Sequence, residues 1–165
     1  MNDPEGKPKV VYDCNIFLQG LIRESGPAVA CLELFERDEI ELFISRAMLT
    51  ELRDVLTRPK LQTRYSLLTA ERAGILLDSL QQRATLIHPV TTNFHFSRDP
   101  KDEPYLNLAL TAGVDFLVSR DHDLLDLMSG ITVECKEFRQ RFRKGRILDP
   151  VEFLKEVQKL QRQQP

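Results

Sequence analysis

The sequence lacks any hydrophobic run long enough to cross a membrane. A spanning helix needs roughly eighteen or more consecutive apolar residues, and no apolar run of the 165-residue chain comes near that length. The N-terminus, MNDPEGKPK, also lacks the apolar region of a secretory signal peptide. We therefore expect a cytoplasmic protein with no membrane segment.

Cysteine is scarce as well. The three cysteines, Cys14, Cys31 and Cys135, form no CxxC pair, and their odd number does not suit a disulfide framework. A disulfide-stabilised fold and a structural zinc site are therefore not expected. Hydrophobic residues make up 42% of the chain and charged residues 29%, which suits one globular domain that folds around its own core.

Acidic and basic residues are unevenly distributed, although the net charge is only −2. Residues 136–165 carry nine Lys or Arg against four Asp or Glu, which gives this segment a charge of +5 and the preceding 135 residues a charge of −7. Such segregation suits an acidic pocket that holds metal beside a basic surface that holds a polyanion. A solvated basic face is the simpler alternative.

Short apolar segments alternate along the chain with segments of helical periodicity. Strands are expected over residues 9–13, 40–44, 84–87, 116–119 and 146–148. Helices are expected over residues 27–37, 45–57, 69–83, 102–112, 123–128 and 149–161, with a loop at 89–101.

This alternation predicts an α/β fold, in which a central parallel sheet of about five strands is covered by helices on both faces. We assign residues 1–8 to a flexible N-terminal arm and 9–154 to one domain. Residues 155–165 then form the end of the last helix and a tail.

Two acidic residues directly follow predicted strands. Asp13 ends the first strand and Asp121 follows the fourth, and open parallel sheets bind ligands beyond the carboxyl ends of their strands. Each position has a simpler alternative. Asp13 can be a turn or helix-cap residue, with Asn15 an equally good N-cap, and Asp121 or Asp123 can form an Asx turn into the next helix.

Two further acids lie beside the apolar faces of predicted helices. Glu51 falls about 60° from Met48 around its helix, at the margin of the buried stripe. Asp102 heads the face that carries Tyr105 and Leu106. The simpler alternatives are a boundary residue for Glu51 and a helix N-terminal acid, stabilised by the helix dipole, for Asp102.

Several carboxylates that converge at one edge of a sheet repel one another unless a cation neutralises them. A site made only of oxygen ligands favours Mg²⁺ or Mn²⁺. Such ions hold phosphate oxygens, activate water and stabilise a departing oxyanion, so phosphodiester hydrolysis is the natural chemistry.

Taken together, these residues resemble the PIN domain over about residues 9–154. The matching motifs are Val10-Val-Tyr-Asp13-Cys-Asn15, Glu51 on its helix, Asp102 before Tyr-Leu-Asn-Leu-Ala-Leu, and Ser119-Arg-Asp121. A narrower resemblance is to the PIN branch assigned to toxins of toxin–antitoxin pairs. It is carried by Ser25-Gly-Pro, Leu49-Thr-Glu51-Leu, Arg58-Pro-Lys-Leu and Asp99-Pro-Lys-Asp102.

The resemblance implies a three-layer α/β/α fold and an endonuclease that cleaves single-stranded RNA with one or two Mg²⁺ or Mn²⁺ ions. It also implies a homodimer and, for the toxin branch, an antitoxin protein as partner. It assigns catalysis and metal binding to four acids, Asp13, Glu51, Asp102 and Asp121, and a supporting role to Asn15, Ser119 and Asp123.

The segment 133–145 is longer and more basic than the link usual in this family. Its basic run, residues 139–146 with Phe138 and Phe142 interleaved, can contact RNA phosphates and stack on bases. Pairing with an acidic surface of a partner and a plain amphipathic helix are the alternatives. The predicted nucleic-acid-binding residues are Arg139, Arg141, Arg143, Lys144 and Arg146.

Three other functions fit the sequence less well. Cys14 stands where the family usually has threonine, but its run is apolar and no histidine is near it in sequence, which favours a buried thiol over a nucleophile. An aspartyl-phosphate phosphatase would need a second aspartate where the chain has Asn15. A catalytically silent PIN-like module that binds RNA or protein is the main alternative, and the presence of all four acids argues against it.

Overall fold

The central strand of the fold is the short apolar run that the sequence places first. In this computed structural model, which describes residues 6–164, Val10, Val11 and Tyr12 are completely buried. The strands are all parallel and follow the order β3-β2-β1-β4-β5. Their bounds are β1 Lys9–Tyr12, β2 Glu41–Ser45, β3 Thr85–Ile87, β4 Phe116–Val118 and β5 Arg146–Leu148.

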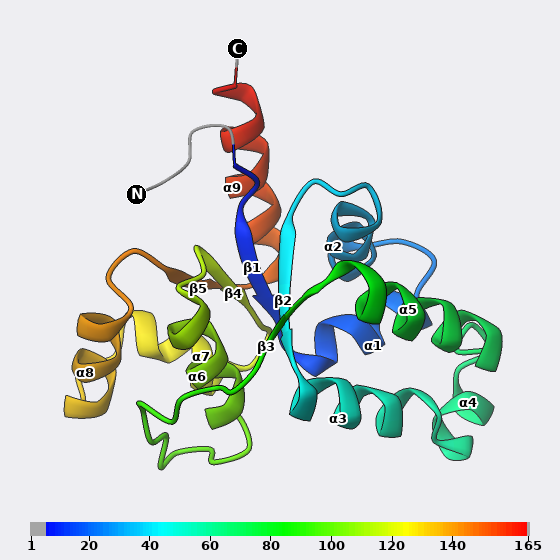
Figure 1. The fold of residues 1–165 in the computed structure, drawn as a ribbon, viewed down its shortest axis with the longest axis horizontal. Coiled ribbons are helices and arrows are strands. Elements are labelled where there is room, and N and C mark those ends of the chain that lie inside the picture. The colour runs from blue at the N-terminus through cyan, green and yellow to red at the C-terminus, as the bar shows by residue number, and fades with distance from the viewer. Residues whose placement is uncertain (1–5, 165) are drawn as a thin grey trace.

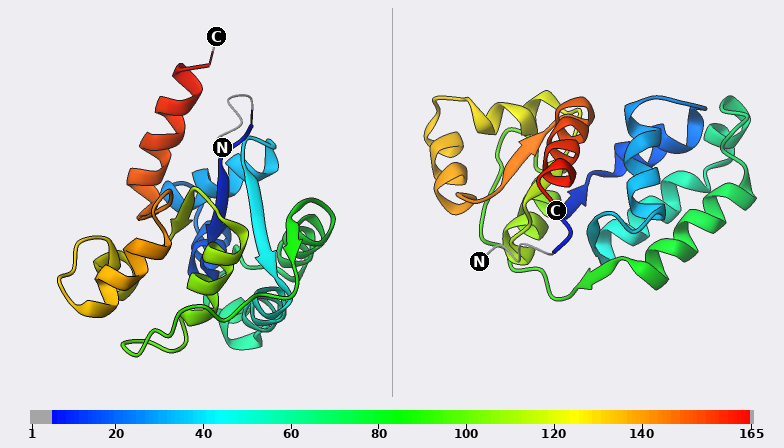
Figure 2. Two further views of the ribbon diagram at one scale, coloured as in Figure 1. Left: turned by 60° about the vertical axis from the view of Figure 1, so that its left-hand side comes forward. Right: turned by 90° about the horizontal axis from the view of Figure 1, so that it is seen from above.

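Helices cover both faces of this sheet, as Figures 1 and 2 show, so the predicted α/β fold is confirmed. Helix α6 packs on one face against β1, β2 and β4, and α9 packs against β4 and β5 beside α2. The helices are α1 Cys14–Ile22, α2 Pro27–Glu36, α3 Arg46–Leu56, α4 Pro59–Arg64, α5 Ala70–Arg83, α6 Glu103–Ala112, α7 His122–Leu125, α8 Val133–Arg141 and α9 Pro150–Arg162, with a 3₁₀ turn at Asp126–Met128.

Side-chain caps mark where several helices begin. Ser45 accepts a hydrogen bond from the Met48 amide at 3.1 Å at the start of α3, as its sequence position predicts. Asp149 does the same for the Glu152 amide at 2.9 Å at the start of α9. Gly113 ends α6 in the left-handed region, at φ 63°, where glycine carries little strain.

Helix α1 was not predicted from the sequence. It begins directly after β1, and Gly20 in its interior disfavours a helix locally. The structure gives Gly20 a reason, because a Cβ at this position would lie 2.5 Å from the Cδ1 atom of Leu32 on α2. Close packing between α1 and α2 therefore outweighs the local preference of glycine. The short helix α4 was not predicted either.

The carboxyl ends of β1, β2 and β4 lead straight into α1, α3 and α7, so the same edge of the sheet carries three helix starts. No helix within residues 6–164 is long and apolar enough to span a membrane. The first five residues of the predicted arm and the last residue of the predicted tail lie outside the described residues.

Candidate active site

A cleft of about 420 Å³ opens beyond the carboxyl ends of β1 and β4. It brings together the four acids that the sequence singles out, and Asn15 also lines it. Asp99, Lys101, Tyr105 and Arg120 lie there too, although the sequence did not predict them as site residues. The full lining is Asp13, Cys14, Asn15, Glu51, Asp99, Lys101, Asp102, Tyr105, Arg120 and Asp121.

Asp13 caps a helix and also faces this cleft. Its Oδ1 atom accepts a hydrogen bond from the Ile16 amide at 3.2 Å, so the helix-cap alternative is correct for the local structure and Asn15 is not the cap. The carboxylate is only 7% exposed. Burial raises the pKa of Asp13 to about 6, while the hydrogen bond from Ser119 and the Ile16 amide act in the opposite direction.

Ser119 links two of the acids from a fully buried position. Its hydroxyl accepts from the Asp121 amide at 2.9 Å and lies close enough to Asp13 to lower the pKa of that carboxyl against the effect of burial. The Asp121 side chain in turn accepts from the Asp123 amide at 2.8 Å at the start of α7. The structure thus places Ser119 as a connection between the end of β1 and the end of β4.

Asp102 lacks the contacts expected of a simple helix-terminal acid. Its side chain makes no capping hydrogen bond at the start of α6, and its buried Oδ2 atom has no hydrogen-bond partner among residues 6–164. Burial, followed by the proximity and negative charge of the Asp121 carboxylate, raises the pKa of Asp102 to about 8. Asp102 does stand at the N-terminus of α6, as the helix-terminal alternative expects, but that position alone does not supply a partner for its buried Oδ2 atom.

A carboxylate oxygen that is buried without a partner is costly unless a cation or a proton neutralises it. Close by, Asp99, Asp121 and Asp123 present oxygen atoms that all lie within 4.8 Å of one another. This acidic cluster can bind a divalent metal ion. Asp123 is already partly neutralised, because Arg98 Nε lies 2.6 Å from its Oδ1 atom.

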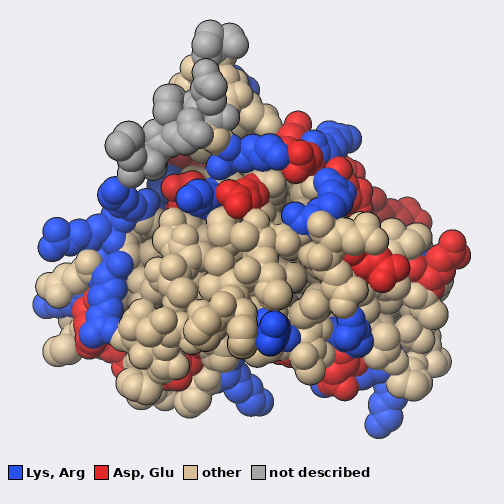
Figure 3. Space-filling model, viewed as in Figure 1, with Lys and Arg blue, Asp and Glu red and all other residues tan. Residues whose placement is uncertain are grey.

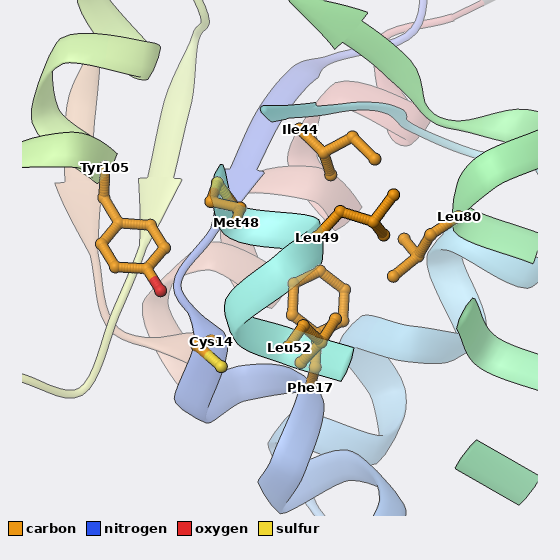
Figure 4. Close-up of a pocket in the computed structure, with 8 residues that line it drawn as sticks. All are labelled: Cys14, Phe17, Ile44, Met48, Leu49, Leu52, Leu80 and Tyr105. Atoms are coloured by element: carbon orange, nitrogen blue, oxygen red, sulfur yellow. The ribbon is translucent and has the colours of Figure 1, made fainter. Parts of the chain in front are cut away.

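Glu51 reaches the cleft from α3, where its side chain is exposed rather than aimed into the core. The Tyr105 hydroxyl donates a hydrogen bond to Glu51 Oε2 at 2.9 Å. Tyr105 and Cys14 separate the acidic cleft from a small apolar cavity that Phe17, Met48 and other core residues line (Figure 4). Because its hydroxyl donates to Glu51 Oε2, Tyr105 restrains the Glu51 side chain at the edge of the cleft.

Burial and the charge of Glu51 raise the pKa of the Cys14 thiol to about 12. A thiol with so high a pKa carries almost no thiolate near neutral pH. This supports the expectation that Cys14 is not a nucleophile.

Replacing Tyr105 by phenylalanine removes the hydrogen bond to Glu51 and keeps the buried ring. We expect the free energy of unfolding to fall by about 1 kcal/mol, the typical net value of one hydrogen bond. In a double-mutant cycle with Glu51→Ala, which removes the acceptor, the two changes should be non-additive when measured by urea denaturation. The pair Tyr65→Phe and Glu51→Ala serves as the control and should be additive; additivity for Tyr105 as well would contradict the coupling.

The raised pKa values of Asp13 and Asp102 predict how the stability of the metal-free protein depends on pH. Both carboxyls bind a proton more tightly in the folded chain than in the unfolded chain, where the ordinary value is 3.8. The stabilisation is complete below about pH 4 and is lost as the pH rises through about 6 for Asp13 and about 8 for Asp102.

With EDTA present, the unfolding free energy of the wild type should therefore fall between pH 6 and 8 more steeply than that of Asp102→Asn. Urea denaturation at a series of pH values measures both slopes. Identical slopes in the two proteins would contradict the raised pKa of Asp102.

The predicted RNA-binding segment lies apart from this cleft, on and after α8. Phe138 and Phe142 are buried, so the prediction that they stack on bases is wrong. The helix alternative holds only for the start of the basic run, because α8 ends at Arg141 and Arg146 begins β5. Figure 3 shows Lys and Arg side chains at the edge of the molecule that α8 forms.

Three of the five predicted basic residues have partners within the chain. Arg139 donates to the Leu127 carbonyl, Arg141 pairs with Glu137, and Arg146 pairs with Glu156. Arg143 and Lys144 are exposed and form no ion pair with any residue from 6 to 164. Contacts between this segment and RNA phosphates remain a prediction.

The fold and the site together indicate a class of protein: an α/β protein that can bind a divalent cation in a polar cleft beyond the carboxyl ends of its parallel strands. Residues 9–123 match the PIN domain family model, and the chain belongs to the PIN domain family. PIN domains are generally nucleases that use divalent metal ions, so the chain has a nuclease-type fold. It is also 29% identical over 153 residues to the uncharacterized protein MJ1680 of Methanocaldococcus jannaschii, across 93% of this chain and 94% of that protein.

Proposed function

We propose that the protein is an endoribonuclease that hydrolyses single-stranded RNA with Mg²⁺ or Mn²⁺ bound by Asp13, Glu51, Asp102 and Asp121. The observation that carries the proposal is the buried Asp102 Oδ2 atom, which has no partner among the described residues. The donors around it are carboxylates, which fit a hard divalent cation. Membership of the PIN family supports RNA as the substrate.

A divalent ion bound by these acids would neutralise the scissile phosphate and lower the pKa of an attacking water. The chain supplies the geometry. Ser119 holds the backbone of Asp121 at 2.9 Å and lies beside Asp13. Tyr105 holds the Oε2 atom of Glu51, and the Oε1 atom, which has no hydrogen bond within residues 6–164, can orient a water or a ligand.

The test uses the purified full chain and one oligonucleotide sequence as single-stranded RNA and as single-stranded DNA, each labelled at one end. We expect internal cleavage of the RNA with Mn²⁺ or Mg²⁺ and none with EDTA. Equal cleavage of the DNA would contradict the preference for RNA. Failure to cleave either strand with either metal would contradict the nuclease proposal and support the silent binding module.

A toxin role is a separate proposal, supported only by the four motifs that resemble the toxin branch. Expression of the chain should then arrest growth, and co-expression of the product of an adjacent open reading frame, as antitoxin, should relieve the arrest. Growth at the normal rate during expression would contradict the toxin role.

The proposed homodimer is tested by light scattering, which should give twice the mass of 19.1 kDa.

A further inference from the structure

The acidic cleft also contains two cations, Lys101 and Arg120. Lys101 directly precedes Asp102 before α6, and Arg120 lies between Ser119 and Asp121 after β4. Neither side chain forms a hydrogen bond or an ion pair with another residue in the described part of the chain. Arg98 behaves differently, because it pairs with Asp123 at 2.6 Å and with Asp126 at 2.9 Å.

The absence of pairing is unexpected for Arg120. Its side chain is half-buried in a cleft that five carboxylates line, and a partly desolvated guanidinium is costly without an anionic partner. Asp13 accepts from the Ile16 amide and Asp121 from the Asp123 amide, and no residue from 6 to 164 forms an ion pair with either cation. The two cations are therefore available to an anionic ligand.

The two cations reach the cleft from different segments of the chain. Lys101 stands directly before α6, and Arg120 directly follows the buried Ser119 after β4. Both line the cleft that also contains the carboxylates of Asp13, Asp102 and Asp121. A polyanion bound in this cleft can therefore contact both cations.

We propose that Arg120 and Lys101 each bind a backbone phosphate of a single-stranded polynucleotide that lies in the acidic cleft. This inference rests on the proposed nuclease function and deepens it, because it assigns substrate-binding residues to the same site. A guanidinium matches the oxygens of a phosphate with paired N–H donors, and an ammonium serves as a point charge. Neither contact reads a base, so binding should depend little on sequence.

The experiment measures binding of a single-stranded 12-nucleotide RNA by fluorescence anisotropy, with Mn²⁺ present. All variants are made in an Asp13→Asn background so that cleavage does not interfere. Arg120→Ala should weaken binding about tenfold and lower the dependence of log K on log salt concentration by about 0.7, the value for one phosphate contact in a single strand. Lys101→Ala should lower this slope similarly.

Two further variants serve as controls. Arg162→Ala removes an exposed arginine at the end of α9, which Figure 1 shows far from the carboxyl ends of the strands, and should change neither affinity nor slope. Arg120→Lys should keep the salt slope and lose part of the affinity. Arg120→Gln, checked by thermal unfolding, repeats the test if the alanine variant does not fold. The inference would be overturned if the salt slope of Arg162→Ala were matched both by Lys101→Ala and by the Arg120 variant, Arg120→Ala or Arg120→Gln.

Failure of this inference and failure of the proposed function give different results. If the wild type cleaves RNA while the slopes do not change, the nuclease proposal stands and Arg120 and Lys101 are not phosphate ligands. If the slopes fall while the wild type cleaves nothing, the cleft binds a polynucleotide without cutting it. The second result supports the assignment of the two cations and contradicts the nuclease proposal.

Discussion

Replacing Asp13 by asparagine is expected to lower the rate of RNA cleavage by at least about 100-fold, since even the neighbours of metal ligands typically cost 10–100-fold when mutated. Asparagine keeps the hydrogen bond to the Ile16 amide, because it caps helices as well as aspartate does. It removes only the negative charge that faces the cleft. The melting temperature should therefore change by no more than a few degrees.

The structure offers a closely matched control at Asp149. Asp13 and Asp149 have the same backbone angles, φ −72° and ψ 164°, and each caps the helix that follows a strand. Asp149 does not line the cleft. Asp149→Asn should therefore leave cleavage unchanged. Equal cleavage by wild type and Asp13→Asn, or equal losses in the two variants, would contradict a metal-binding role for Asp13.

The largest effect on stability is expected at Phe153, at the base of α9. Its ring is fully buried and packs edge-on against Tyr12 at 5.8 Å and Phe116 at 5.6 Å between ring centres. Phe153→Ala should lower the free energy of unfolding by about 3–5 kcal/mol, as removal of a buried aromatic ring does. The melting temperature should fall by about 10 °C. Urea and thermal denaturation measure both quantities.

This prediction also tests the extent of the domain, because Phe153 lies beyond the residues 9–123 that match the family model. Val151→Ala is the control, since Val151 is 47% exposed on the same turn of α9. It should change stability by less than about 0.5 kcal/mol. If the two variants are equally stable, α9 is not part of the cooperative fold, and the predicted domain range of 9–154 is wrong.

The sheet could be predicted from the sequence because its inner strands are buried on both faces. Val10 and Leu117 are completely inaccessible, so each strand reads as an uninterrupted apolar run. Helix α1 could not be predicted in this way. Its start coincides with the end of β1, and its interior Gly20 is explained only by the contact with Leu32, a residue on another helix.

Four acids could be predicted to converge because they occupy strand ends and helix faces, whose positions follow from periodicity. Asp99 and Lys101 could not, since they belong to a loop without periodicity. Contacts with α6 fix the path of that loop: the side chain of Asn107 on α6 accepts a hydrogen bond from the Phe94 amide of the loop at 2.9 Å. The prediction that Phe138 stacks on bases was wrong because it also depends on a long-range contact. The Phe138 ring packs against that of Phe94, with 5.2 Å between the ring centres, and the sequence alone does not show this contact.

The central claim is that the carboxylates in the cleft bind a divalent cation, and a crystal soaked with Mn²⁺ tests it most directly. Anomalous scattering should show a manganese ion coordinated by Asp13, Asp102 and Asp121 at about 2 Å, with Asp102 Oδ2 among its ligands. A soaked crystal with no manganese in the cleft, or an Asp121→Asn crystal with an unchanged manganese site, would contradict the account.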